Sequence, residues 1–209
     1  MKALIADDHE LFRGGVKQLL TEEFEDIVVL EAGGLDEALE RLLEHAPVDL
    51  LVMDLNMPGV EGMDSIAALS DAYPDAKLVV LSASEDRRDV LDALGAGING
   101  YIPKSLSAGE IAAALRDVLD GRVFVPRAIA RRGEAVPPRA KAAPPAGLDN
   151  LTERQRHVLD ELMFGKSSKE IARALDVAEG TVKIHLAAIY RALGVKSRAE
   201  AIAKVSASR

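Results

Sequence analysis

The stretch DLLVMDLNMPG, residues 49–59, decides how the front of this chain folds. Its apolar run LLVM is typical of a strand buried on both faces of a parallel sheet. Asp54 follows that run directly, and Pro58 ends the segment a few residues later. A buried strand therefore delivers a carboxylate to its own tip. Taken alone, this stretch fits either an Asp that caps a turn or an Asp that does chemistry at the edge of a sheet.

The composition narrows the class of protein. The 209 residues are 48% apolar but only 3% aromatic, which suits an Ala/Leu/Val-rich α/β or helical core. No apolar run reaches the roughly 18 residues of a membrane span, and the apolar run at the N-terminus is too short for a signal peptide. The absence of cysteine excludes disulfides, thiol chemistry and a Cys-based zinc site. We therefore expect a soluble cytoplasmic protein.

Charge is unevenly distributed along the chain. Residues 1–126 hold 25 acidic and 10 basic side chains (net −15), residues 127–148 hold 1 and 5 (net +4), and residues 149–209 hold 8 and 11 (net +3). The acidic front would repel nucleic acid, whereas the rear can approach it. The stretch RRGEAVPPRAKAAPPAG between them contains two Pro pairs and no apolar period, as in an extended linker. We predict a domain at 1–125, a Pro/Ala-rich basic linker at 126–147 and a second domain at 148–209.

Strands and helices are predicted to alternate in the front domain. The predicted strands are 2–6, 27–31, 49–54, 77–82 and 100–102, and the helices between and after them lie near 10–22, 35–45, 61–72, 86–95 and 107–120. This order predicts a doubly wound, five-stranded parallel sheet with helices on both faces. Ligands bind such sheets just beyond the carboxyl ends of the strands.

Five polar residues follow these strand ends: Asp7, Asp8, Asp54, Ser82 and Lys104. Singly, each has an ordinary explanation as a helix cap, a turn residue or a surface charge. Together, three converging carboxylates call for a cation, and their oxygens suit a hard ion such as Mg²⁺. A carboxylate can also act as a nucleophile and form an acyl phosphate. The hydroxyl and the ammonium group can then hold phosphate oxygens.

The motifs ADDHELFR, DLNMPGVEG, VLSAS and GAGINGYIPKS make residues 1–122 resemble the receiver domain of two-component response regulators, which has a flavodoxin-like fold. The resemblance implies that Asp54 is the phospho-acceptor. It assigns Mg²⁺ to Asp8, Asp54 and the Asn56 carbonyl oxygen, with Asp7 assisting. It also implies that Ser82 and Lys104 contact the phosphoryl group and that Tyr101 turns inward when Ser82 moves. Pro103 stands before Lys104, whereas many receivers carry Pro after this Lys.

The rear domain reads as four helices with short connections. Thr152 with Gln155, and Ser167 with Glu170, form possible capping boxes. The pair 168–175 and 179–193 has helix-turn-helix proportions. On the longer helix, one face at helical spacing is apolar and faces the core. The opposite face shows Gly180, Ile184, Ala187 and Arg191, flanked by Lys183. That face is either merely solvated, or its Ile touches a thymine methyl group in a major groove.

The motifs LTERQRHVL, KEIARAL, EGTVKIHL and LGVKSRAEAI make residues 148–205 resemble the LuxR-type helix-turn-helix, an all-α four-helix domain. With the front domain, this is the architecture of NarL/FixJ-type response regulators. The resemblance implies that Lys183, Ile184 and Ala187 lie near bases. It implies that Thr181, His185 and Arg191 lie near the DNA backbone.

We therefore expect a transcriptional regulator, not an enzyme. Its expected partners are a sensor histidine kinase, a pseudo-palindromic operator in double-stranded DNA, and a second copy of the chain once it is phosphorylated. One alternative is a phosphatase of the haloacid dehalogenase class, but position 56, where that class needs a second acid, is Asn. Another is a receiver that signals without phosphorylation, against which the complete pocket argues.

Overall fold

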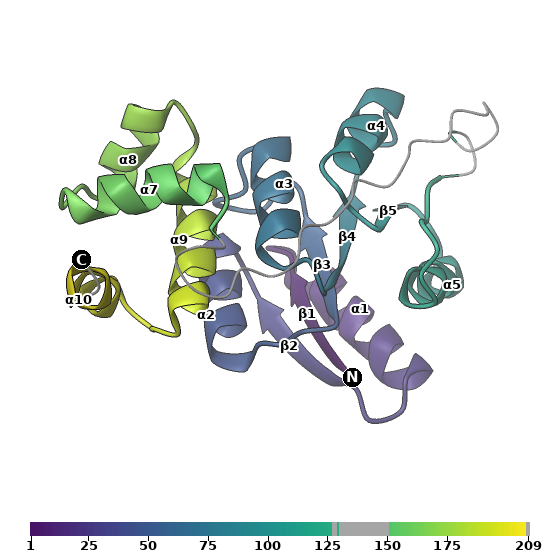
Figure 1. Cartoon of the computed structure of the whole chain (residues 1–209). Helices are drawn as coiled ribbons and strands as arrows, with labels where there is room; N and C mark the ends of the chain where they lie inside the picture. Colours follow the sequence, from purple (N-terminus) through teal and green to yellow (C-terminus); the bar gives the residue numbers. More distant parts are fainter. Residues whose placement is uncertain (127–128, 130–150, 208–209) are drawn as a thin grey trace.

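The computed structural model describes residues 1–126, 129 and 151–207 (Figure 1). Residues 1–126, here called the sheet domain, form a five-stranded parallel sheet in the order β2-β1-β3-β4-β5. The strands are β1 (Lys2–Ala6), β2 (Val28–Ala32), β3 (Leu50–Asp54), β4 (Lys77–Ser82) and β5 (Gly100–Pro103). The prediction of a doubly wound parallel sheet is confirmed, and no strand end differs from its predicted position by more than one residue.

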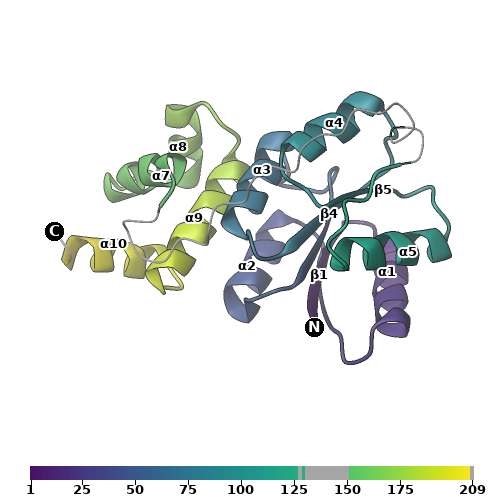
Figure 2. The same ribbon diagram turned by 45° about the vertical axis from the view of Figure 1, so that its right-hand side comes forward.

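Helices cover both faces of the sheet (Figure 2). They are α1 (Glu10–Glu23), α2 (Leu35–His45), α3 (Met63–Ala72), α4 (Arg87–Gly95) and α5 (Ala108–Leu119). The apolar sides of α1 and α5 bury one face of the strands, and those of α2, α3 and α4 bury the other. Helix α3 begins two residues later than predicted, directly after Gly62, whose φ of +77° places it in the left-handed region.

Strand β3 lies in the middle of the sheet and is buried at every residue. It pairs with β1 on one side and β4 on the other, so neither edge of β3 meets water. This position explains the continuous apolar run that precedes Asp54. It also places Asp54 in the middle of the edge where all five strands end.

Residues 151–207, here called the helical domain, contain α7 (Glu153–Met163), α8 (Ser168–Leu175), α9 (Glu179–Leu193) and α10 (Arg198–Ala207). Both predicted capping boxes form, with Thr152 starting α7 and Ser167 starting α8. Gly194 ends α9 in the left-handed conformation, with φ of +64°. These helices enclose an apolar core of their own around Val158, Ile171 and Ile189.

The helical domain packs on the sheet domain through α9, which lies across α2 and α3 (Figures 1 and 2). Nearly all of the predicted linker at 126–147 lies outside the described residues, and the domain boundaries stay a prediction. Within the described part of the chain, no helix is both long enough and apolar enough to cross a membrane.

Candidate functional sites

The first candidate site is an acidic pocket where the strands of the sheet domain end. Asp7, directly after β1, has no exposed surface, and Asp54, the last residue of β3, is 1% exposed. Lys104 follows β5, and its Nζ lies 2.7 Å from Asp7 Oδ2 and 2.9 Å from Asp54 Oδ2. The fold thus brings together three charged residues that are far apart in the sequence.

The Lys104 ammonium group offsets the two buried carboxylates. Burial alone would lower the pKa of Lys104, but its contacts with Asp7 and Asp54 outweigh burial and raise the pKa above its usual value. The side chain is therefore charged at neutral pH. The ring of Phe12 on α1 lies 4.8 Å from Nζ, within the range of a cation–π contact.

The rim of the pocket offers a place for a cation. Ligand atoms of Asp7, Asp8, His9 and Asp54 all lie within 4.8 Å of one another. His9 Nδ1 is 2.7 Å from Asp8 Oδ1, and the His9 backbone N–H donates to Asp7 Oδ1 at 2.8 Å. Three carboxylates in this space fit a hard divalent cation. The Asn56 backbone N–H donates to Asp54 Oδ1 at 3.2 Å, so this loop also lies at the site.

Two residues near the pocket were not singled out by the sequence analysis. The imidazole of His9 joins the carboxylate cluster, and its position directly after the Asp pair was an available signal. Arg13, one turn into α1, donates to the Asp7 backbone oxygen at 2.6 Å. That contact depends on the docking of α1 against the sheet, which no local pattern in the sequence reports.

Ser82 and Tyr101 lie on the next two strands, beyond Asp54. Ser82 ends β4, is buried, and accepts a hydrogen bond from the Ser84 backbone N–H at 3.1 Å. Tyr101 on β5 points inward, and its hydroxyl donates to the Ser84 backbone oxygen at 2.9 Å. Burial raises the pKa of the Tyr101 hydroxyl. Both side chains therefore meet the same β4–α4 loop.

The second candidate site is the face of α9 expected to meet DNA. Thr181, Ile184, His185 and Ala187 are buried, with Ile184 fully so, and Lys183 and Arg191 are half-buried. The first of the two interpretations of this face, that it is merely solvated, is therefore wrong, and its contact with DNA stays a prediction. The sheet domain covers it, because Ile184 and its small neighbours form an apolar surface that packs against the core beside α2 and α3.

Polar contacts surround this apolar patch. Lys183 Nζ is 2.8 Å from Asp36 Oδ2 on α2. At the start of α9, the Thr181 and Ser65 hydroxyl oxygens are 3.2 Å apart. Toward the end of α9, the Arg191 guanidinium group lies 4.3 Å from the centre of the Tyr73 ring and donates to the Ala72 backbone oxygen. Every residue predicted to meet DNA thus lies at or beside the interface between the domains.

The two domains also approach each other closely at Gly180, the second residue of α9. A side-chain carbon at this position would overlap the backbone oxygen of Gly59, and it would lie 3.1 Å from Leu35 Cδ2. Gly59 belongs to the β3–α3 loop that begins directly after Asp54. The N-terminus of α9 therefore contacts the loop that leads away from the acidic pocket.

Comparisons with known proteins agree with this architecture. Residues 3–116 match the model of the response regulator receiver domain, and residues 149–205 match that of the luxR family of bacterial regulatory proteins. This chain belongs to the LuxR-type response regulators. It is therefore a two-component response regulator with a LuxR-type DNA-binding domain, and a transcription regulator.

Named relatives of this response regulator align over nearly its whole length. The glycerol metabolism activator of Pseudomonas putida is 38% identical over 96% of this chain and 93% of its own. The nitrate/nitrite response regulator NarL of Escherichia coli K12 is 34% identical over 99% of this chain and 95% of its own. These relatives are regulators and not enzymes by name.

Solved structures resemble this response regulator as well. A LuxR family DNA-binding response regulator from Silicibacter pomeroyi is 31% identical, with a TM-score of 0.54 over 61% of this chain and 98% of its own. RcsB of Salmonella typhimurium has a TM-score of 0.57 over 99% of this chain and 98% of its own. At 21% identity, the RcsB match shows the fold alone.

Proposed function

We propose that Asp54 accepts a phosphoryl group from a sensor histidine kinase, and that this reaction opens the two domains for DNA binding. The observation that carries the proposal is the setting of Asp54: a buried carboxylate at a strand tip, beside a second buried carboxylate and 2.9 Å from a charged lysine. Burying two adjacent carboxylates costs free energy even when a lysine lies between them, and charged groups in such settings are concentrated at functional sites.

In the proposed reaction, an oxygen of Asp54 forms the new O–P bond. The N–P bond to the kinase histidine breaks, and its electron pair stays on the imidazole nitrogen. Lys104 moves from the carboxylate to a phosphoryl oxygen, and Ser82 donates its hydroxyl to another. Mg²⁺ held by Asp8, Asp54 and the Asn56 carbonyl oxygen, with Asp7 assisting, would neutralise charge on the phosphoryl oxygens. The carboxylate donor set described above fits that ion.

The unphosphorylated chain is, in this proposal, a closed form that cannot bind DNA. The face of α9 that would enter a major groove is occupied by α2 and α3, and Lys183 is paired with Asp36. The sheet domain is acidic, so it would also repel the DNA backbone while it is docked. Rearrangement of the loop after Asp54 would disturb its contact with Gly180 and release α9.

Once released, α9 would read DNA with Lys183, Ile184 and Ala187 near bases and with Thr181, His185 and Arg191 near the backbone. A single helix-turn-helix makes few contacts, so two linked copies on adjacent half-sites gain affinity through effective concentration. We therefore propose a phosphorylation-dependent homodimer on a pseudo-palindromic operator. We propose a cytoplasmic location, because there the protein can meet both the kinase and the DNA.

A phosphorylation assay tests the central step. Incubation with acetyl phosphate and Mg²⁺ should add one base-labile phosphoryl group, detected as a mass increase of the intact chain. Asp54→Ala should abolish the adduct, and Asp8→Ala should slow its formation. Asp92→Asn changes an exposed carboxylate of α4 and should leave labelling unchanged. Labelling that persists in Asp54→Ala would refute the assignment.

A second assay separates acceptance of the phosphoryl group from its readout. Ser82→Ala should still be phosphorylated on Asp54, because Ser82 is not the acceptor. Phosphorylation should no longer increase DNA binding, because the missing hydroxyl is the group that donates to the phosphoryl oxygen. If the phosphorylated variant binds DNA as well as the phosphorylated parent, the signal passes through other residues.

A further inference from the structure

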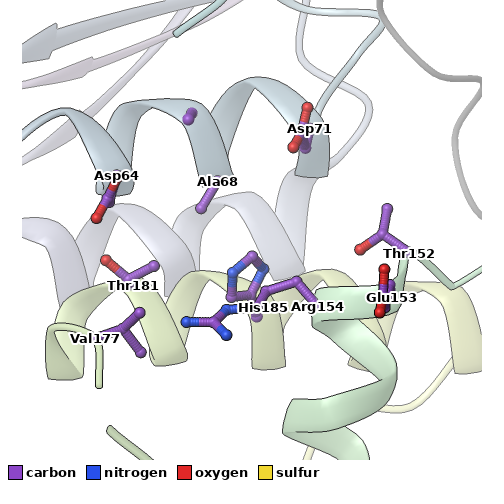
Figure 3. A pocket seen from close by; sticks show the side chains of 10 residues that line it. Asp64, Ala68, Asp71, Thr152, Glu153, Arg154, Val177, Thr181 and His185 are labelled. Atoms are coloured by element: carbon purple, nitrogen blue, oxygen red, sulfur yellow. The ribbon is translucent and has the colours of Figure 1, made fainter. Parts of the chain in front are cut away.

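His185 is a buried titratable group at the interface between the domains. It belongs to α9, is 7% exposed, and borders a cavity of about 530 Å³ between α3 of the sheet domain and α7 of the helical domain (Figure 3). Its Nδ1 atom is inaccessible to solvent and, among the described residues, has no hydrogen-bond partner. An orphaned nitrogen of this kind accommodates a neutral imidazole better than a charged one.

The charged groups around this cavity come from two elements. Helix α3 contributes Asp64 and Asp71, and α7 contributes Glu153 and Arg154. None of these carboxylates accepts a hydrogen bond at His185 Nδ1, which has no partner among the described residues. The guanidinium group of Arg154 instead acts on His185 as a like charge.

The other side chains that line the cavity, including Thr152, carry no charge. The turn between α8 and α9 contributes Val177, which is apolar, and α9 itself contributes Thr181, which pairs with Ser65. Lys183 on α9 forms its ion pair with Asp36 on α2, not at this cavity. A protonated His185 would thus place a second N–H in a site without an acceptor.

We propose that protonation of His185 drives the two domains apart, so that acid opens this response regulator without phosphorylation. In the docked form, the imidazolium group has a buried Nδ1–H that nothing accepts. In the open form, the part of His185 that faces α3 is exposed, and water satisfies the N–H group. The proposal rests on the closed form described under Proposed function, but not on the phosphorylation chemistry.

The sign and size of the effect follow from linkage. Burial, aided by Arg154, lowers the pKa of His185 in the docked form to about 4, against about 6.5 for an exposed histidine. Docking is therefore insensitive to pH above about 6.5, weakens as the pH falls from there, and stops changing below about 4. Because Arg154 belongs to the same domain as His185 and stays beside it after opening, the free-histidine value is an upper bound for the open form. Relative to pH 7.5, the opening constant should therefore rise by at most about fourfold at pH 6 and about tenfold at pH 5.5.

The first test measures the pKa of His185 directly in the unmodified, unphosphorylated full-length chain. Only four histidines are present, so NMR signals of labelled imidazoles can be followed across the pH range and His185 assigned with His185→Gln. We expect the pKa of His185 to lie well below the value of about 6.5 that is usual for an exposed histidine. A pKa of His185 at that usual value would overturn the proposal.

The second test follows the opening itself. Because the chain has no cysteine, dyes can be placed on cysteines introduced at the exposed positions Glu44 on α2 and Ser206 on α10. Energy transfer between them should fall reversibly from pH 7.5 to pH 5.5 in the parent without any phosphodonor. His185→Gln should abolish this change, and the matched variant His157→Gln should retain it.

The outcomes of this test are distinct. A pH response that survives in His185→Gln would refute the proposal. The parent chain could show the expected pH response and yet accept no phosphoryl group on Asp54 in the phosphorylation assay. That result would leave the His185 proposal standing and refute only the phosphorylation scheme. Circular dichroism of each variant checks that its helices are intact, and the NMR titration of the unmodified chain does not depend on any variant folding correctly.

Discussion

Gly180→Ala should release α9 from the sheet domain while leaving that helix intact. The added methyl group would overlap the backbone oxygen of Gly59 and approach both the Gly59 carbonyl carbon and Leu35 Cδ2 to 3.1 Å. Two of these three atoms belong to the backbone, so they cannot move aside as a flexible side chain would. In α9 itself, alanine is the better helix former by about 1 kcal/mol. The substitution therefore opposes docking but favours the helix.

The size of the effect can be worked from what undocking exposes. Ile184 has no exposed surface in the docked form, and burial of an isoleucine side chain is worth roughly 1.5–3 kcal/mol. Loss of that contribution alone corresponds to about a 10- to 100-fold increase in the affinity of the unphosphorylated chain for DNA. The phosphorylated chain, which is open in the proposed scheme, should change much less.

Fluorescence anisotropy with a DNA duplex selected by residues 148–209 would measure these affinities. Gly109→Ala is a matched control, because Gly109 is also the second residue of a helix, α5, and an added Cβ there meets nothing within 4 Å. It should leave binding unchanged. If unphosphorylated Gly180→Ala bound this duplex no better than the parent while the isolated domain bound it tightly, the docked interface would not be what suppresses DNA binding.

Four further changes probe the closed form and the acidic pocket. Ser65→Cys with Thr181→Cys replaces two hydroxyl groups whose oxygens are 3.2 Å apart; oxidation should link the domains and abolish DNA binding, and reductant should restore it, unless the domains do not dock in solution. Asp36→Ala removes the partner of Lys183 and should raise unphosphorylated DNA binding by about two- to fivefold, the range expected for an exposed ion pair. Lys183→Ala removes the same ion pair but should weaken DNA binding in gel-shift titrations, and equal effects of both variants would exclude a DNA contact by this lysine. Lys104→Ala leaves two buried carboxylates without their cation and should lower the melting temperature in calorimetry, with added Mg²⁺ restoring part of it.

Local sequence was sufficient to predict the helices and strands, and to predict which strand-end residues meet in the pocket, but not the part taken by His9 and Arg13. The apolar run before Asp54 is typical of a fully buried strand, and the alternation of strands with helices predicted a parallel sheet. Because parallel strands end at one edge, the polar residues that follow them were expected to meet there. The capping boxes at Thr152 and Ser167 could also be predicted from the sequence, since both residues of each box lie within a span of four residues.

Tertiary structure decided the contacts that join distant segments. Lys104 could be placed near Asp54 by topology, but that its ammonium group bridges Asp7 and Asp54 depends on how the side chains pack. Arg13 reaches the backbone of Asp7 only because α1 docks beside β1. A sequence pattern reports which face an element presents, and it carries no information about the distance between two faces.

Ile184 shows this limit most clearly. Helical spacing placed it correctly on the side of α9 that faces away from the core of the helical domain, and from there water, a DNA base or another part of the protein could equally well cover it. In the structure, the sheet domain covers it completely. The periodicity of a helix records only the core that the helix itself helps to build. Docking of a second domain in one state of the protein adds no periodic pattern to the helix sequence. Only the folded arrangement of both domains therefore reveals this contact.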